Sequence, residues 1–487
     1  MRIRIFGKID SLLGRVTMYR LALYYLLFLV AYGMALCFFG VLPWRAEDLL
    51  VSAAVLTVVS WGTNKILARI FRADENIESS LITGLILALL INPDPALQSS
   101  SLIFWGFAGL SASASKYLFA PFKKHIFNPA AFAVFATGSV ASWWVGLFPA
   151  MLPPVFIGGL IVARKLRAGG QVLSFLGVSL AMIYWKGGLT AIPQTFYYAP
   201  FFFFAFIMLT EPATSPSKKS FRALYGALVG FLSAFTQYET ALIIGNIFSY
   251  IASFKYGLTL NLKEKKLIAS AETYEFSFVP SRKINFQPGQ YLEWALKHRG
   301  ADSRGVRRFF TIASSPTETE IKLGTKFYPG GSTFKKALIR LLPGAKLSAG
   351  RLAGDFTMPE DKSKKLVFIA GGIGITPFRS MVKYLIDMNE KRDIVLLYSN
   401  KTESEIAYRN IFEEARVKKL GIKTVYISND KDGLVTDKTI MKETPDFKER
   451  YFYISGPYAM VNAFEKTLSK MGVSGTHIKT DFFPGYA

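Results

Sequence analysis

The chain has 487 residues, about three times the length of a typical domain, so two or more domains are expected. Its hydrophobic fraction of 51% and formal net charge of +24 form an average that fits no single protein class. Residues 1–255 carry only 20 of the 58 Lys and Arg and 9 of the 34 Asp and Glu, and the rest lie in residues 256–487. This predicts an apolar membrane half and a soluble half, and the basic excess then reflects membrane topology, which argues against a nucleic-acid partner.

The scarcity of Cys and His limits which metal cofactors the chain can hold. It has one Cys, Cys37, and three His, of which His125 alone lies in the apolar half. An iron–sulfur cluster or a structural zinc ion needs about four thiolate or imidazole ligands. A haem held between two membrane histidines needs two His inside the spans, and the apolar half has only one. The sequence therefore predicts no metal site, and any redox chemistry is expected to use organic cofactors or a partner's metal.

Apolar runs predict an α-helical polytopic membrane domain in residues 1–255. Several runs are shorter than the roughly 17 residues that a perpendicular membrane helix needs, so some are expected to be half-helices or tilted. With a cytoplasmic N-terminus, the outside segments hold only Arg45 and Lys186, which favours a multi-pass protein of the cell inner (cytoplasmic) membrane with both termini cytoplasmic. The ten predicted spans lie at about 21–43, 48–69, 79–92, 100–119, 129–148, 150–163, 172–185, 195–210, 223–237 and 240–254.

Three proline-containing turns of this half look specialised. They are Ile91-Asn92-Pro93-Asp94-Pro95, Phe127-Asn128-Pro129-Ala130 and Glu211-Pro212-Ala213-Thr214-Ser215-Pro216. The first and third turns end spans three and eight, which occupy equivalent places if spans one to five and six to ten are two repeats. Helices interrupted there would fit an inverted repeat around a site. The alternative is that proline only ends helices at the membrane edge.

These turns in this order, with Glu78-Ser79-Ser80-Leu81 before and Glu239-Thr240-Ala241-Leu242 after them, carry a family resemblance. Residues 20–255 resemble the membrane B/D subunit family of the sodium-pumping NADH:quinone reductase and Rnf complexes. The resemblance implies flavin within the membrane domain. Because the chain lacks the family's Ser-Gly-Ala-Thr string, we expect a non-covalent FMN or riboflavin there, with Asn128 and Thr214 as binding residues.

Beyond residue 255 the pattern changes to short strands and then to alternating strands and helices. Strand-length runs at 258–267, 272–279, 291–296, 309–314 and 320–326 predict an antiparallel β-barrel in residues 256–360. From Lys365 on, strands at 366–370, 394–399, 423–427 and 450–455 alternate with helices, which predicts a doubly wound α/β domain in residues 361–487.

The barrel carries an ordered set of flavin motifs. Phe286-Gln287-Pro288-Gly289-Gln290-Tyr291 precedes Arg308-Phe309-Phe310-Thr311, and Gly330-Gly331-Ser332-Thr333 opens a predicted helix. A diphosphate favours a guanidinium fork, and a planar ring favours an aromatic wall. The set resembles the ferredoxin–NADP reductase superfamily, which implies FAD binding with Arg308 on the pyrophosphate, Phe310 beside the isoalloxazine and Thr311 as a catalytic hydroxyl near flavin N5. The expected FAD-binding residues also include Tyr291, Gly331, Ser332 and Thr333.

The α/β domain carries a second set for a nicotinamide dinucleotide. Phe368-Ile369-Ala370-Gly371-Gly372-Ile373-Gly374-Ile375-Thr376-Pro377 leaves a strand and opens a helix, where glycines let the backbone approach phosphates. The resemblance implies NAD(P)H binding and places Ser455 near the nicotinamide as a second catalytic residue. The choice of coenzyme stays open: Lys401 could meet a 2′-phosphate, but no Arg pair follows Ser399, which favours NADH. The expected binding residues are Gly371, Gly372, Gly374, Thr376, Pro377, Ser399, Gly456, Pro457 and, in the tail, Phe483.

Joining the halves predicts a membrane flavoprotein oxidoreductase. Cytoplasmic NAD(P)H would reduce FAD, and electrons would cross through flavin in residues 1–255 to an extracytoplasmic acceptor protein or quinone, with membrane lipid around the spans. One alternative is a membrane-anchored NAD(P)H reductase that delivers electrons to quinone or a cytoplasmic carrier. Another is a redox-coupled ion transporter.

Overall fold

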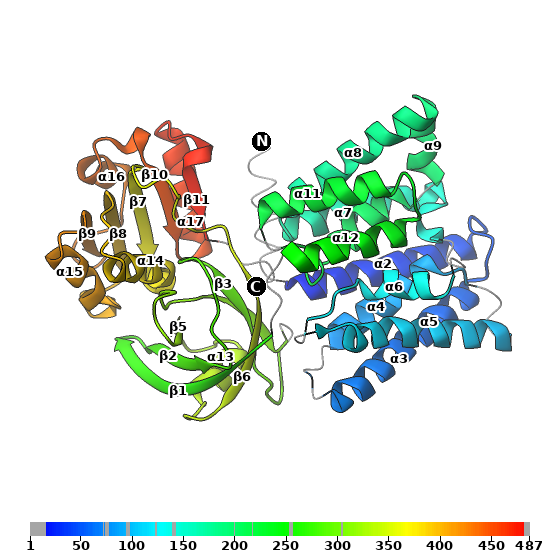
Figure 1. Cartoon of the computed structure of the whole chain (residues 1–487), viewed down its shortest axis with the longest axis horizontal. Coiled ribbons are helices and arrows are strands. Elements are labelled where there is room, and N and C mark those ends of the chain that lie inside the picture. The colour runs from blue at the N-terminus through cyan, green and yellow to red at the C-terminus, as the bar shows by residue number, and fades with distance from the viewer. Residues whose placement is uncertain are drawn as a thin grey trace. The chain divides into compact units, whose positions relative to one another are not determined.

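The computed structural model describes residues 16–71, 73, 77–93, 98–121, 124–138, 143–198, 200–216, 218–252, 257–302 and 305–481. The chain divides into two compact units, which meet in the sequence between Gly257 and Leu258. The helical unit comprises the described residues up to Gly257, and the C-terminal unit comprises the described residues from Leu258 on (Figure 1).

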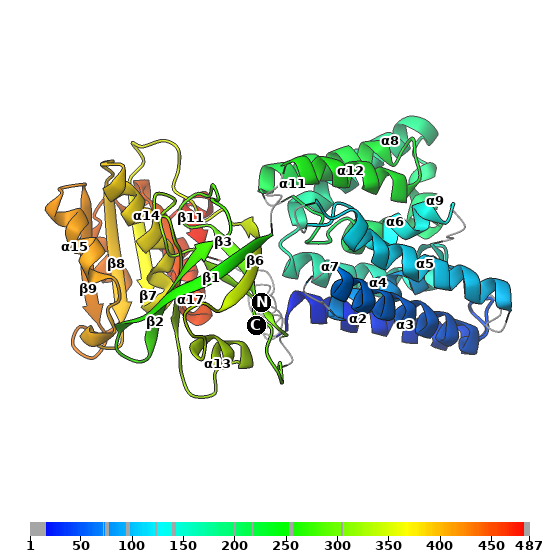
Figure 2. The ribbon, with the colours of Figure 1, turned by 60° about the horizontal axis from the view of Figure 1, so that its bottom comes forward.

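Among the described residues, most apolar runs of the first half are helical. They pack in two groups, with α2 to α5 in one and α8, α11 and α12 in the other (Figures 1 and 2). The helices are α2 Met18–Phe38, α3 Ala46–Ile70, α4 Ile77–Leu90, α5 Ser99–Leu118, α6 Pro129–Ala136, α7 Leu152–Lys165, α8 Gly169–Gly187, α9 Ala191–Tyr198, α10 Phe201–Phe203 with the π-helical turn Phe204–Met208, α11 Lys219–Leu232 and α12 Tyr238–Ala252.

Glycines set the closest helix contacts in both groups. A Cβ on Gly84 of α4 would lie 2.4 Å from the Cα of Thr57 in α3. A Cβ on Gly226 of α11 would lie 2.2 Å from the carbonyl oxygen of Gln171 in α8. Neither backbone could approach so closely with a larger residue, because real Cβ atoms do not come this near to another backbone.

Two helices end inside the unit, and side chains satisfy their last carbonyls. At the end of α4, the indole nitrogen of Trp144 donates to the Ala88 carbonyl at 2.7 Å. At the end of the π-helical turn, Gln171 Nε2 donates to the Leu209 carbonyl at 2.6 Å and Asn128 Nδ2 to the Met208 carbonyl at 3.4 Å. These bonds replace the partners that the next helical turn would have supplied.

The prediction of a ten-span membrane domain with an inverted repeat is wrong for this structure. Among the described residues, two helices are long and apolar enough to cross a membrane, α2 and α3, or three if the bent pair 191–197 and 201–208 counts as one span. The apolar runs do become helices, but the others are shorter or less apolar. The 14 residues of α4 reach about 21 Å, well short of a hydrocarbon core of ~30 Å.

The C-terminal unit begins with a six-stranded antiparallel sheet in the order β4-β3-β6-β1-β2-β5. This order leaves β4 and β5 as edges, so the sheet is an open half-barrel rather than the predicted barrel. It includes one strand, β6, that the sequence pattern did not predict. Figure 2 shows α13 at one end of this sheet. The elements are β1 Leu258–Ala269, β2 Thr273–Pro280, β3 Tyr291–Ala295, β4 Arg307–Thr311, β5 Ile321–Lys326, α13 Thr333–Ile339 and β6 Lys346–Ala353.

A five-stranded parallel sheet follows, in the order β11-β10-β7-β8-β9. Helices α14 and α15 cover one face and α16 and α17 the other, so the sheet is doubly wound as predicted (Figure 1). The strand order reverses between β7 and β10. The elements are β7 Leu366–Gly371, α14 Thr376–Asp387, β8 Ile394–Asn400, α15 Arg409–Val417, β9 Ile422–Ser428, α16 Asp437–Glu443, β10 Tyr451–Ser455, α17 Tyr458–Lys470 and β11 Ile478–Thr480.

A buried ion pair and main-chain contacts join the two sheets of the C-terminal unit. Arg379 of α14 is 3% exposed and binds Glu318 through both terminal nitrogens, Nη2 at 3.0 Å, while Nη1 also donates to the Ala313 carbonyl. Ser380 donates to the Ser314 carbonyl at 2.6 Å. Burial by itself would raise the pKa of Glu318, but the hydrogen bonds and charge of Arg379 outweigh it and lower that pKa.

Candidate active site

The two predicted catalytic hydroxyls come together on one carboxylate. Thr311 Oγ1 donates to Asp481 Oδ2 at 3.4 Å, and Ser455 Oγ donates to the same oxygen at 3.1 Å. Both hydroxyl residues are buried, with 5% and 2% of their surface exposed. The structure therefore brings a residue of the antiparallel sheet and a residue of the parallel sheet to a single point.

Strand ends position these three residues. Thr311 is the last residue of β4 and Ser455 the last of β10, while Asp481 directly follows β11. The Asp481 N–H donates to the Ile454 carbonyl at 3.0 Å, which fixes the carboxylate beside the end of β10. In open parallel sheets, ligands bind outside the carboxyl ends of the strands where the strand order reverses, and β10 borders that point here. Sequence reasoning gave Asp481 no role.

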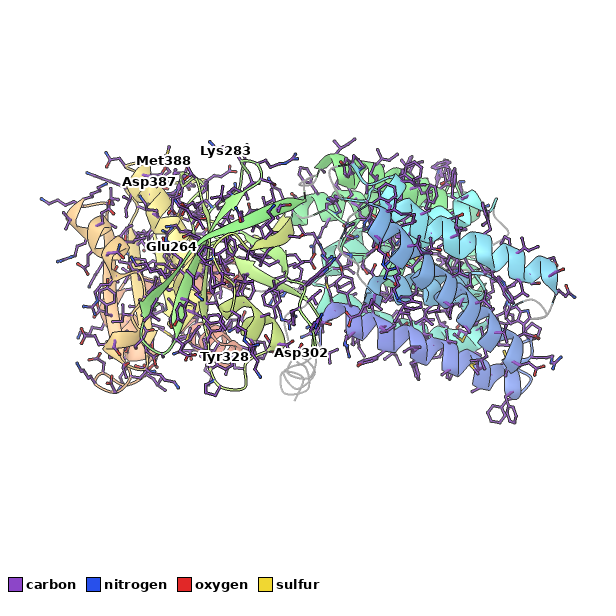
Figure 3. All side chains as sticks on the ribbon, turned by 90° about the horizontal axis from the view of Figure 1, so that it is seen from below. Glu264, Lys283, Asp302, Tyr328, Asp387 and Met388 are labelled. Carbon is purple, nitrogen blue, oxygen red and sulfur yellow. The ribbon has the colours of Figure 1, made fainter. Side chains whose placement is uncertain are left out.

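The predicted FAD pyrophosphate residue, Arg308, is 7% exposed and held in a fixed orientation. Its Nη1 donates to the Arg307 carbonyl at 2.7 Å and the Gly305 carbonyl at 3.1 Å, and its Nη2 lies 3.3 Å from Asp302 Oδ1. The other oxygen of Asp302 accepts a hydrogen bond from the Thr333 N–H at 3.0 Å. Figure 3 shows Asp302 along the same edge of the C-terminal unit as Tyr328. The Asp302 carboxylate thus joins Arg308 to Thr333, another of the predicted FAD-binding residues.

Aromatic rings line the barrel next to Arg308. The guanidinium lies 5.3 Å from the ring centre of Phe334, and the ring of Phe310 lies 5.8 Å from that of Phe334. Phe310 is half-buried, which leaves part of its ring for a planar ligand. Tyr291 pairs with Thr311 across β3 and β4, and its ring meets Phe309 edge-on.

The glycine-rich segment at residues 330–333 shapes the start of α13. Gly330 has φ +79° and space for a ligand, since a Cβ there would meet nothing within 4 Å, whereas Gly331 approaches the Tyr328 carbonyl. Ser332 caps the helix by accepting from the Lys335 N–H. The Thr333 hydroxyl accepts from the Asp302 N–H at 2.9 Å and lies 3.0 Å from His298 Nε2.

The second glycine segment forms a turn whose glycines do different work. A Cβ on Gly371 would lie 2.4 Å from Met460 Sδ, and one on Gly374 would lie 2.5 Å from the Ser455 carbonyl oxygen. These two glycines allow close packing against the start of α17 and the end of β10. Gly372 differs, because its φ is +51° and a Cβ would face open space. Its backbone is therefore exposed in the way that close approach to a phosphate requires.

The remaining predicted dinucleotide residues surround this turn. Thr376 and Pro377 begin α14, and the Thr376 hydroxyl donates to the Ile373 carbonyl at 3.2 Å. Ser399 lies opposite Gly371 in the β7–β8 register. Gly456 and Pro457 follow Ser455 and lead into α17, and a Cβ on Gly456 would lie 3.2 Å from the Gly371 backbone.

The residues present fit both dinucleotides. For FAD, Arg308 supplies the guanidinium, Phe310 the aromatic surface and Thr311 a hydroxyl at the sheet edge. For NAD(P)H, Gly372 supplies open backbone at the switch point between β7 and β10.

The other predicted site residues lie elsewhere. Asn128 is 2% exposed and caps α6, since its Oδ1 accepts from the Ala131 N–H at 3.0 Å and its backbone N–H donates to Asn246 Oδ1 at 2.8 Å. The Thr214 hydroxyl donates to Glu211 Oε2 at 2.9 Å. These bonds are internal to the helical unit, and neither side chain offers support for a flavin there. Phe483 lies outside the described residues.

Comparison with known proteins supports the C-terminal assignment. Residues 368–466 match the family described as the oxidoreductase NAD-binding domain. The flavohemoprotein of Candida albicans is 30% identical over 210 residues, which are 41% of this chain and 51% of that protein. The NADPH oxidoreductase of Mycobacterium tuberculosis is 25% identical over 195 residues, 39% of this chain and 50% of that protein. The chain therefore spans about half the length of the curated relatives it matches.

Among solved structures, the flavohem-like FAD/NAD-binding domain of nitric oxide dioxygenase from Vibrio cholerae is 20% identical, with a TM-score of 0.41 over 46% of this chain and 98% of that domain. The family match lies within the C-terminal unit, and the resemblance of residues 20–255 to a family of membrane subunits stays a prediction. The chain thus contains a segment, residues 368–466 of the C-terminal unit, that matches the oxidoreductase NAD-binding domain family.

Proposed function

We propose that this chain takes a hydride from NAD(P)H onto FAD between Thr311 and Ser455 and hands the electrons to an acceptor at a membrane. The observation that carries the first step is the meeting of both hydroxyls at Asp481, one from each sheet. Hydride transfer needs two ring systems held in a defined orientation more than it needs acid–base groups.

The side chains would divide the work as follows. Arg308 would bind the FAD diphosphate with its guanidinium, and Phe310 would pack beside the flavin ring. Gly372 would let the backbone reach the diphosphate of NAD(P)H. When bound, FAD supplies the conversion of a two-electron hydride donor into a source of single electrons.

Asp481 acts as a positioning residue in this scheme. Because it accepts hydrogen bonds from Thr311 and Ser455, it fixes the direction of both hydroxyl hydrogens. With their hydrogens donated to Asp481, the two hydroxyl oxygens could only accept hydrogen bonds from a bound ring, for example from an N–H group.

The test of the first step is anaerobic mixing of the purified full chain, loaded with FAD, with NADH or NADPH. The flavin absorbance should bleach with at least one coenzyme. Failure of the chain to retain FAD, or FAD that only dithionite can bleach, would contradict the proposal.

For the second step, we propose a location in the cytoplasmic membrane with both termini on the cytoplasmic side. Helices α2 and α3 are each long and apolar enough to span. The segment between them holds Arg45, whereas Lys65, Arg69 and Arg72 lie in the sequence at or just beyond the far end of α3, which favours a cytoplasmic location for that end. Electrons would cross to an extracytoplasmic acceptor protein or quinone, which requires a second carrier such as a non-covalent FMN or riboflavin. Counting the flavins of the purified chain tests this, because one FAD and no other flavin would contradict it.

A membrane-anchored reductase that does not cross the membrane is the second candidate. The small number of spanning helices among the described residues favours it, since two helices suffice for an anchor. Proteoliposomes with the C-terminal unit facing out separate the two candidates. Reduction by external NADH of an impermeant acceptor trapped inside requires crossing, whereas reduction of external acceptors alone indicates an anchor.

A further inference from the structure

One carboxylate at the end of β8 holds two cations. Glu403 Oε1 lies 3.1 Å from Arg409 Nη2, and its Oε2 lies 3.2 Å from Lys431 Nζ. We call Glu403, Arg409 and Lys431 the Glu403 cluster. It joins the loop after β8, the start of α15 and the loop after β9. The pKa of Glu403 is lowered by the hydrogen bonds and charges of Lys431 and Arg409, so the carboxylate is ionised at neutral pH.

The cluster stands where the far end of the coenzyme would lie. Ser399 pairs with Gly371 in register, so the end of β8 is the next strand end beside the glycine turn. In doubly wound dinucleotide-binding folds, the strand end next to the phosphate turn meets the adenosine ribose, where an acidic residue favours a 2′-hydroxyl and a free cation favours a 2′-phosphate.

The loop that carries Glu403 is fixed from both sides. The Ser270 N–H donates to the Ser404 carbonyl at 3.0 Å, and Lys326 Nζ lies 2.9 Å from Glu405 Oε2. The Asp430 N–H donates to the Lys401 carbonyl at 3.2 Å, which ties the loop after β9 to the loop after β8. The carboxylate of Glu403 is therefore held near its two cations by the fold, although its own surface is half exposed.

The charges at this edge disfavour the 2′-phosphate of NADPH. Arg409 and Lys431 already share Glu403, and Lys326 is paired with Glu405. Lys401 adds a cation on the same loop, and Asp430 and Asp432 add two carboxylates. A 2′-phosphate would have to compete with Glu403 for both cations, whereas a ribose hydroxyl can donate to that carboxylate.

We propose that the module selects NADH over NADPH and that Glu403 is the specificity-determining residue. This inference rests on the proposed reduction of FAD by a nicotinamide coenzyme. The Glu403→Gln substitution keeps the size of the side chain and removes its charge, which leaves Arg409 and Lys431 able to meet a 2′-phosphate.

The experiment compares kcat/KM for NADH and NADPH in FAD reduction by the full-length chain and its variants. The wild-type chain should favour NADH. Glu403→Gln should raise the ratio of NADPH to NADH efficiency by about fivefold or more, as expected for one exposed charge near another. Glu414→Gln is the matched control, since Glu414 is similarly exposed and pairs with Lys418 at 3.1 Å at the C-terminal end of α15. It should leave the ratio unchanged.

Different outcomes would overturn the proposed reduction of FAD and the proposed coenzyme selection by Glu403. Reduction of FAD by neither coenzyme would overturn the proposed function. Reduction by NADPH as efficient as by NADH in the wild-type chain, or a ratio that Glu403→Gln does not change, would overturn only the selection by Glu403. Because exposed ion pairs contribute little to stability, both variants should unfold at the wild-type temperature.

Discussion

The helical unit and the C-terminal unit both bury polar side chains, but those side chains bind different partners. In the helical unit, Trp144, Gln171 and Asn128 donate to main-chain carbonyls where helices end inside the protein. In the C-terminal unit, Thr311 and Ser455 donate to a carboxylate at the ends of strands from two different sheets. Buried polar groups therefore have two roles in this chain. Some satisfy the carbonyls at helix ends, and others assemble a site.

The partner of a buried polar side chain distinguishes a structural residue from a functional one. A buried side chain bound to an orphan carbonyl removes a desolvation cost and is expected to affect stability. A set of side chains that converge on one point from distant parts of the sequence is expected to affect a rate. Substitutions in each group test whether stability or rate is affected.

The largest expected effect is on stability, at the ion pair that joins the two sheets. Arg379→Met leaves Glu318, which is partly buried, with Lys322 as its remaining cation, and loss of the buried member of this pair should cost about 3 kcal/mol of unfolding free energy. Chemical denaturation of the full-length chain, followed by flavin release, measures it. The exposed pair Lys418–Glu414 gives the control, because Lys418→Met should change stability by much less.

The same pair predicts a pH dependence. The pKa of Glu318 in the folded chain is lowered from its ordinary value of 4.5, so its contribution is fully present above pH 4.5 and is lost as the pH falls through the folded pKa. Wild-type stability should therefore decline in acid below that value. The double variant Glu318→Gln with Arg379→Met should lose this part of the acid dependence, and an unchanged profile would mean that other carboxylates control it.

The next effect is on coenzyme use. Gly372→Val places a side chain in the open space beside the turn, so reduction of FAD by NADH should slow by about 100-fold or more, the factor that misplacement by ~1 Å can cost. Dithionite should still bleach the flavin. Gly472→Val is the control, because Gly472 also has a positive φ and open space but follows α17. Normal NADH kinetics in Gly372→Val would remove the turn from the site.

A smaller effect is expected at the shared carboxylate. Asp481→Asn replaces charged hydrogen bonds to Thr311 and Ser455 with weaker ones, and flavin reduction should slow by about tenfold. If Asp481 only positions the hydroxyls, the rate of reduction at saturating NADH should fall while FAD occupancy stays constant. Loss of FAD with an unchanged rate would assign Asp481 to cofactor binding instead.

The smallest effect comes from the helical unit and tests the comparison directly. Gln171→Leu removes one of two donors to the Leu209 carbonyl. Because Ser215 Oγ still donates to it at 3.1 Å, the loss should cost about 0.5–1.5 kcal/mol of stability. Reduction of FAD by NADH should not change, since the substitution lies in the other compact unit. A slower reduction in this variant would show that the helical unit contributes to the first chemical step.

Much of the C-terminal unit was predictable because its signals are local. Arg308, Phe310 and Thr311 lie on one strand, and the glycine turn follows β7 directly, so a short pattern determines both. Two strands, β6 and β11, were not predicted because they lack such a local pattern. β6 contains Gly350 and polar residues among its apolar ones, and β11 has only three residues, so neither has a distinct local pattern.

The helical unit shows where sequence patterns fail. Apolar composition correctly predicts helices, but it does not determine how long each remains straight. The turn at Phe204–Met208 and the early end of α4 depend on donors from Gln171, Asn128 and Trp144, which lie far away in the sequence. The ten-span prediction was wrong because it treated every apolar run as a potential span.

The division into an apolar and a charged half, and the glycine, arginine and aromatic motifs that a dinucleotide needs, can be read from the sequence. Which of these residues share a site depends on the tertiary structure. Thr311 and Asp481 are 170 positions apart, and Glu403 reaches Lys431 across the ends of two strands. Such contacts depend on the order of strands in a sheet, because adjacent strand ends bring distant parts of the chain within hydrogen-bonding distance.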